Sequence, residues 1–100
     1  MEGVGLKNVY LVQAGEKSLV NNTIAYLPYA AGTIAAKAWG NQLIRDSFNL
    51  DRIVFLREPV ERLVESLDDP YLVGFSSYLW NHEYNKTVAK SIKERYPACL

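Results

Sequence analysis

Length, composition and charge limit what this chain can be. Its 100 residues support one small domain, so residues 1–100 are expected to form part of a single domain. Hydrophobic residues make up 49% of the chain and charged residues 22%, which is typical of a soluble globular protein. Eleven basic and eleven acidic residues give a formal net charge of zero, and no basic cluster stands out. A nucleic acid partner is therefore not expected.

The residue pattern argues against two further classes. No apolar stretch approaches the roughly 20 residues that span a bilayer, and the first residues carry no signal-peptide pattern. We therefore expect no membrane association, and we expect a cytoplasmic location. The single cysteine, Cys99, excludes an internal disulfide and any multi-cysteine zinc or iron–sulfur site within this chain.

The first half of the chain predicts a strand, a loop and a helix. Residues 7–13 are nearly continuous in apolar side chains, as expected of a strand buried on both faces. Residues 16–26 are polar and indicate a loop. Pro28 suits the first turn of a helix, and residues 42–49 are expected to add another turn or two. The inner positions of this helix are expected to be Ala30, Ala31, Ile34, Ala35 and Ala38.

The second half repeats the alternation. A second strand is expected over 52–57, where branched and aromatic residues gather, and a third over 71–76. Pro59 is expected to open the second helix. Its apolar face would hold Val60, Leu63, Val64 and Leu67. The third helix is expected to end before Pro97 and to bury Leu79, Val88, Ala89, Ile92 and Tyr96.

Alternating short strands and helices predict an α/β fold with a parallel sheet joined by right-handed crossovers. The expected architecture is a three-layer, flavodoxin-like or Rossmann-type fold. After the third helix the chain reaches Leu100, where a fourth strand should begin. Since three parallel strands leave an open sheet edge, we expect a chain truncated after its third βα unit.

Ligands of open parallel sheets bind beyond the carboxyl ends of the strands. This rule selects Gln13, Ala14 and Gly15 after the first strand, and residues 57–59 after the second. The most suggestive segment follows the third strand, where hydroxyl and aromatic side chains gather. It runs from Ser76 to Asn81, with an amide at the entrance of the next helix, and its candidate binding residues are Ser76, Ser77, Tyr78 and Trp80. Such a loop can hydrogen-bond the polar edge of a ligand and cover its apolar face, although a Ser can also cap a helix and the aromatics can simply pack.

Other candidate motifs are weaker. Residues 15–18 lack the first glycine and the Gly-Lys-Ser run of a phosphate loop. His82 is the lone histidine and is more typical of a solvated or capping residue than of a metal ligand. Glu58, Glu61 and Glu65 share one helical face and indicate a solvent-facing surface. Cys99 has no adjacent base to activate it. No catalytic residue and no metal ligand is therefore expected in this chain.

Several segments together resemble a known family. They are Tyr26–Gly32, Leu72–Ser76, Trp80-Asn81 with Glu83–Asn85, and Ile92–Pro97. From about Asn8 onward the chain resembles the amino-terminal cobalamin-binding domain of class B radical-SAM proteins, a family that includes methyltransferases and the magnesium-protoporphyrin IX monomethyl ester oxidative cyclase.

The resemblance implies a cobalamin-binding module that serves an enzyme whose chemistry lies elsewhere. In full-length relatives a radical-SAM domain follows in the same chain, with S-adenosylmethionine and a four-iron–four-sulfur cluster. Cobalamin would lie over the carboxyl edge of the sheet. The resemblance places it against Gln13, Ala14 and Gly15 and against the segment that begins Ser76-Ser77-Tyr78.

Two departures from related cobalamin proteins matter. The Asp-x-His-x-x-Gly motif that ligates cobalt in methionine-synthase-like domains is absent, so the cobalt would lack a protein histidine below it. The glycine-rich loop after the fourth strand would lie past Leu100. We therefore expect this chain alone to bind cobalamin weakly or not at all, and a low-micromolar dissociation constant for hydroxocobalamin would contradict that hypothesis.

Three alternatives stay open. The chain could be an interaction module that forms a homodimer through the open edge of its third strand. It could be a response-regulator-like phosphoacceptor, although Gln13-Ala14 and Ser76-Ser77 stand where acidic residues are needed. It could also be a flavodoxin-type carrier, although its first loop lacks a Ser/Thr/Gly phosphate cradle. Fold alone does not choose between them.

Overall fold

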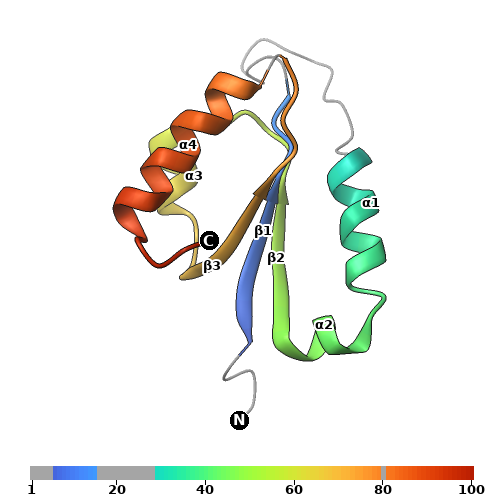
Figure 1. Ribbon diagram of the computed structural model, residues 1–100. Coiled ribbons are helices and arrows are strands. Elements are labelled where there is room, and N and C mark those ends of the chain that lie inside the picture. The colour runs from blue at the N-terminus through green and yellow to red at the C-terminus, as the bar shows by residue number, and fades with distance from the viewer. Residues whose placement is uncertain (1–5, 16–28, 80) are drawn as a thin grey trace.

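The computed structural model describes residues 6–15, 29–79 and 81–100, and these alternate between strands and helices (Figure 1). The strands are β1 (Lys7–Val12), β2 (Phe48–Val54) and β3 (Pro70–Phe75). Two helices, α1 (Tyr29–Ala38) and α2 (Gln42–Ser47), precede β2. Helix α3 (Val60–Glu65) joins β2 to β3, and α4 (His82–Arg95) follows β3. The predicted strand–helix alternation is confirmed.

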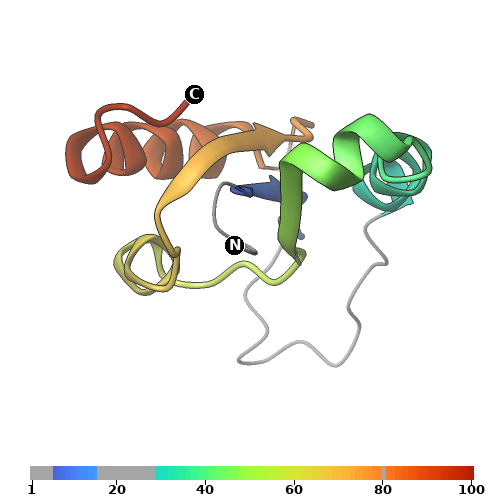
Figure 2. The same cartoon turned by 90° about the horizontal axis from the view of Figure 1, so that it is seen from below.

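The three strands form one parallel sheet in the order β2-β1-β3. Val12 at the end of β1 pairs with Val54 on one side and Phe75 on the other, so all three strands end at one level. Helices α3 and α4 cover one face of the sheet and α1 lies on the other (Figures 1 and 2). The α/β prediction is confirmed, and the order matches the first three βα units of a flavodoxin-like fold.

The main core lies between the sheet and the pair α3 and α4. Successive side chains of a strand point to opposite faces, which places Tyr10, Val12 and Ala14 on this side. They pack against Leu63, Val64, Leu67, Tyr84, Val88 and Ile92. Burying each large apolar side chain contributes about 1.5–3 kcal/mol, so this cluster is the main source of stability.

Tyr10 is fully buried at the centre of this core. Its hydroxyl oxygen accepts a hydrogen bond of 2.8 Å from the backbone N–H of Asp68, which follows α3. Burial raises the pKa of Tyr10 from 10.0 to about 12, because the phenolate form would lose its hydration. The residue thus fastens β1 to the start of β3 and packs the core at the same time.

Helix α1 packs on the other face through its smallest side chains. Ala31 and Ala35 are buried, as predicted, and small residues allow a helix to approach a sheet closely. The prediction that Ile34 faces inward is wrong, since 56% of that residue is exposed. The first turn is also tied to β1, because the side-chain Oε1 of Gln13 accepts a 2.8 Å hydrogen bond from the N–H of Ala31.

The second strand begins earlier than predicted. It spans Phe48–Val54 instead of 52–57, and α2 ends at Ser47. Backbone pairing of Lys7 with Phe48 and of Val9 with Leu50 extends the strand at its start. The pairing register shifts by one residue before Arg52, which marks an irregularity of the β-bulge kind. Such a shift interrupts the alternation of inward and outward side chains, so the first part of the strand does not show the pattern by which strands are recognised in a sequence.

Two further predictions about the second half are wrong. Leu79 was expected in the buried stripe of the last helix, but it lies before α4 and is 96% exposed. Glu58 was expected on one helical face with Glu61 and Glu65, but it precedes α3, where its carboxylate lies 3.9 Å from the Arg52 guanidinium. Glu61 and Glu65 are exposed, as predicted.

The outer edge of β3 is paired where it meets the last residue. The N–H of Leu100 donates to the carbonyl of Tyr71 (2.9 Å), and the N–H of Val73 donates to the carbonyl of Leu100 (3.0 Å). The N–H and the carbonyl of Leu100 thus bond to Tyr71 and Val73, two residues apart on β3, which is the hydrogen-bond pattern of parallel strands. The edge predicted to be open is therefore occupied at these positions, and the predicted homodimer through it stays a prediction.

Within residues 6–15, 29–79 and 81–100, no helix is long and apolar enough to cross a membrane. The predicted loop at 16–26 and the predicted helix opening at Pro28 lie outside the described residues.

Candidate functional site

The carboxyl edge of the sheet brings together loops that are distant in sequence. The N–H of Gln13 donates to the carbonyl of Val54, and the N–H of Ser76 donates to the carbonyl of Val12, each at 2.8 Å. The ladder therefore continues one residue past β1 and β3. As a result, the segments beginning at Gln13 and Ser76 leave the sheet side by side, as the parallel order requires.

Asn81 joins these two segments. Its side chain is completely buried, and its Nδ2 donates to the carbonyl of Ala14 (3.1 Å) and to the carbonyl of Ser76 (3.0 Å). Its Oδ1 accepts a 2.6 Å hydrogen bond from the N–H of Tyr78. One amide thus holds the end of β1, the end of β3 and the loop between β3 and α4. A buried polar side chain is tolerated here because its hydrogen-bonding groups are satisfied.

Asn85, one helical turn further along α4, supports the same loop. Its Nδ2 lies within hydrogen-bond distance of the Ser76 carbonyl (3.3 Å), the Ser77 Oγ (3.2 Å) and the Asn81 Oδ1 (3.4 Å). Two of these three atoms can only accept, which fixes which end of the amide faces them. The Oδ1 of Asn85 is buried and has no hydrogen-bond partner among the described residues.

A groove of about 520 Å³ opens in front of this loop. Its lining combines hydroxyl, imidazole and carboxylate groups with one exposed apolar side chain, and consists of Ser77, Tyr78, Leu79, His82 and Glu83. The Ser77 Oγ lies 3.4 Å from the His82 Nδ1. A fully exposed leucine beside polar groups suits a ligand that has an apolar face and a polar edge.

A second set of contacts fastens the loop after β2 to the same edge. The guanidinium of Arg57 donates to the carbonyl of Gly15 (3.1 Å) and lies 4.9 Å from the centre of the Tyr84 ring. The hydroxyl of Tyr84 donates to the carbonyl of Glu58. Burial raises the pKa of Tyr84 from 10.0 to about 12. These contacts position backbone and supply no group free for chemistry at neutral pH.

The residues predicted to bind a cofactor have different surroundings. Ala14, Ser76, Ser77 and Tyr78 lie together, joined by the two asparagines. Gly15 lies at the same edge, whereas the Oε1 of Gln13 is engaged with α1. Trp80 lies outside the described residues.

Sequence reasoning missed the positioning role of Asn81, Asn85 and Arg57. Asn81 was included in the candidate segment as a possible ligand contact and Asn85 was noted only as part of a resemblance, yet together they carried a signal. They stand four residues apart at the start of a helix and on its buried face.

The weaker motifs have ordinary surroundings. Cys99 is buried, and burial raises the pKa of its thiol, which opposes a nucleophilic role. His82 is exposed at the start of α4. Among the described residues, no group of three or more His, Cys, Asp and Glu side chains could hold a metal ion.

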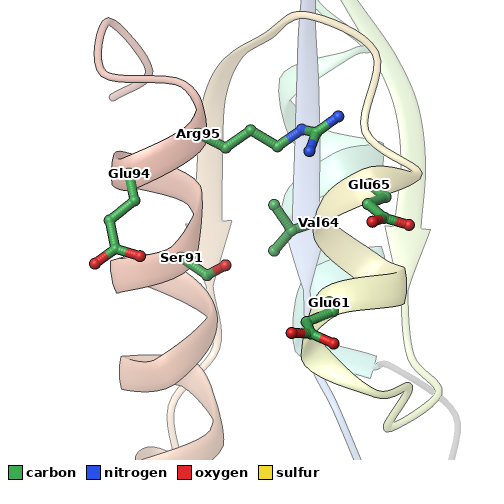
Figure 3. Close-up of a pocket in the computed structure, with 6 residues that line it drawn as sticks. All are labelled: Glu61, Val64, Glu65, Ser91, Glu94 and Arg95. Carbon is green, nitrogen blue, oxygen red and sulfur yellow. The ribbon is translucent and has the colours of Figure 1, made fainter.

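Another groove, of about 410 Å³, lies between α3 and α4 (Figure 3). The side chains of Ser91 and Arg95 extend from α4 toward α3 in this view. The remaining lining residues are Glu61, Val64, Glu65 and Glu94. The loops at the carboxyl edge do not contribute to this groove, which therefore forms no part of the candidate site.

Fold and site define a class: a parallel α/β module whose strand ends present a groove with polar and apolar lining. No family model matches the chain. Over 79 residues it is 33% identical to the cobalamin-dependent radical SAM methyltransferase TokK of Streptomyces tokunonensis. It is 29% identical, also over 79 residues, to the 2-(S-pantetheinyl)-carbapenam-3-carboxylate methyltransferase of Streptantibioticus cattleyicolor.

Both alignments cover 79% of this chain and 12% of the relative, so the chain spans about an eighth of the length of these relatives. The similarity supports the resemblance to cobalamin-dependent radical-SAM enzymes that the sequence predicted, and both relatives are named as methyltransferases.

Proposed function

We propose that this chain is a cobalamin-binding module of a radical-SAM enzyme. The observation that carries the proposal is the similarity to a cobalamin-dependent radical SAM methyltransferase over 79 of the 100 residues. The fold supports it, because the groove lies beyond the carboxyl ends of the strands, where ligands of open parallel sheets bind.

The donor set at the groove fits a large amphipathic ring. The groove is lined by the hydroxyl-bearing residues Ser77 and Tyr78 and by Leu79, whose apolar side chain is exposed. Such a lining suits a cofactor that brings its metal within its own macrocycle. Bound cobalamin would supply a cobalt centre able to carry a methyl group. The residues proposed to contact it are Gln13, Ala14, Gly15, Ser76, Ser77, Tyr78 and Trp80.

The chemistry itself is proposed to lie outside this chain. A radical-SAM domain of the same parent protein would hold S-adenosylmethionine and the four-iron–four-sulfur cluster, and would be the partner of this module. Methyl transfer is the favoured parent reaction, because both relatives are methyltransferases. The magnesium-protoporphyrin ester cyclase type is the alternative parent. A cytoplasmic location is part of the proposal.

A titration of the ¹⁵N-labelled chain with hydroxocobalamin tests the proposal by NMR, a method that also reports weak binding. We expect concentration-dependent shifts at the amides of Gly15, Ser77 and Tyr78. The groove at the opposite edge, of about 420 Å³ and lined in part by Lys7 and Ala98, serves as an internal control that should not shift.

A His82→Gln variant tests whether the imidazole in the groove lining alone causes the shifts, because an exposed imidazole can ligate cobalt without any built site. We expect the shifts at Gly15 and Ser77 to persist in this variant. Shifts that vanish with the imidazole, or that spread equally over both edges, would contradict a cobalamin site at the carboxyl edge.

A further inference from the structure

The loop between β3 and α4 contains most of the proposed contacts, and two of its described side chains point into solvent. Leu79 is almost completely exposed, and Ser77 is exposed as well. The shape of this loop depends on backbone groups that are hydrogen-bonded to a buried side chain. The N–H of Tyr78 and the carbonyl of Ser76 both bond to Asn81.

Asn81 also sets the distance between two parts of the candidate site. The Nδ2 of Asn81 donates one hydrogen bond to the carbonyl of Ala14, which is 67 positions away in the sequence. It donates a second to the carbonyl of Ser76. The two loops cannot separate without breaking one of these bonds. Because the side chain is fully buried, water does not readily replace the lost partner.

We propose that Asn81, supported by Asn85, is the positioning residue that holds the loop after β3 against the loop after β1 in the shape that receives the cofactor. The effect on affinity rests on the function proposed above. A loop that is already fixed loses less conformational entropy when a ligand binds, so preorganisation raises affinity without adding a contact.

Amide hydrogen exchange tests the positioning without any cofactor. In the unsubstituted chain we expect the Tyr78 amide to be protected, although it lies in a surface loop. In Asn81→Ala we expect its exchange to accelerate by at least roughly tenfold, while the amides of β1 keep their rates. An unprotected Tyr78 amide in the unsubstituted chain would overturn the proposal, even if the variant failed to fold.

The matched control is Asn41→Ala. Asn41 also accepts backbone hydrogen bonds, from Leu43 and Ile44, but it caps α2 at the far end of the molecule (Figure 1). We expect this variant to lose stability and to keep the protection of Tyr78. Equal acceleration of Tyr78 and of the β1 amides in Asn81→Ala would mean general destabilisation and would also overturn the proposal.

Affinity is the second measurement. We expect hydroxocobalamin to bind Asn81→Ala roughly tenfold more weakly than the unsubstituted chain, and Asn41→Ala unchanged. Unchanged affinity in Asn81→Ala, with Tyr78 exchange accelerated, would refute the link to binding. If the unsubstituted chain shows no specific shifts with hydroxocobalamin, cobalamin binding by this chain alone is refuted, while the exchange of the Tyr78 amide still decides the positioning role.

Discussion

Tyr10 and Tyr84 carry their hydroxyl groups into partly buried positions on the same side of the sheet. Each makes a hydrogen bond with main chain from the α3 region, through Asp68 and Glu58 respectively. Sequence reasoning treated residues 7–13 simply as an apolar strand. It could not assign these bonds, because the partners lie far along the chain and become neighbours only when the sheet has formed.

The raised pKa values of these two tyrosines predict an alkaline weakness. The folded-state pKa of about 12 exceeds the ordinary value of 10.0, so the folded chain holds these protons more tightly than the unfolded chain. The resulting stability is fully present below pH 10 and is lost as pH rises from about 10 to about 12. Urea unfolding over this range should show a falling midpoint.

Tyr10→Phe separates this effect from general alkaline damage. The variant should be less stable than the parent at neutral pH, because the Asp68 N–H loses its acceptor. It should also lose less stability between pH 10 and 12, because one titrating group is gone. A decline as steep as that of the parent chain would count against the role assigned to Tyr10.

Helix α2 illustrates how local signals succeed at the scale of an element. Asn41 accepts from the N–H of Leu43 at 2.9 Å and of Ile44 at 3.3 Å, which satisfies donors that the first turn leaves unpaired. The sequence predicted additional helix here and placed its end near Asn49. The end at Ser47 was not predicted, because strand pairing with β1 takes the chain from Phe48 onward.

Replacing Asn41 by Ala should destabilise the chain by about 1 kcal/mol, the usual cost of removing an asparagine N-cap. Thermal or urea unfolding followed by circular dichroism measures the loss. Asn49→Ala is a suitable comparison, since the exposed Asn49 side chain bonds only to the Asn8 side chain among the contacts of the described residues. A loss as large in Asn49→Ala would show that the cap has no special role.

At the scale of the whole molecule, alternation and strand composition sufficed to predict a parallel α/β fold. They sufficed also to predict that the loops after the strands meet at the carboxyl edge, because the ends of parallel strands lie there together. They did not reveal how that edge is held together. The bonds of Asn81 to Ala14 and Ser76 depend on the strand order, which places the ends of β1 and β3 side by side.

The pairing of Leu100 with β3 gives a prediction at this scale. Deleting Leu100 removes the acceptor of the Val73 N–H, so exchange of that amide should accelerate. The amide of Leu11, in the central strand β1, should keep its rate. If Val73 exchanges equally fast in both chains, the ladder does not form in solution. Sedimentation of the two chains at high concentration would also test whether the predicted homodimer uses the edge that the deletion exposes.

The central place of β1 in the sheet has a consequence for how the protein is made. This strand is synthesised before both of its neighbours, since Val12 pairs with Val54 on one side and with Phe75 on the other. Closing these long chain loops is entropically costly and slow compared with forming a local hairpin. The apolar strand therefore has no pairing partners during part of its synthesis. Until Phe75 has emerged, the nascent chain exposes this strand and needs protection from aggregation.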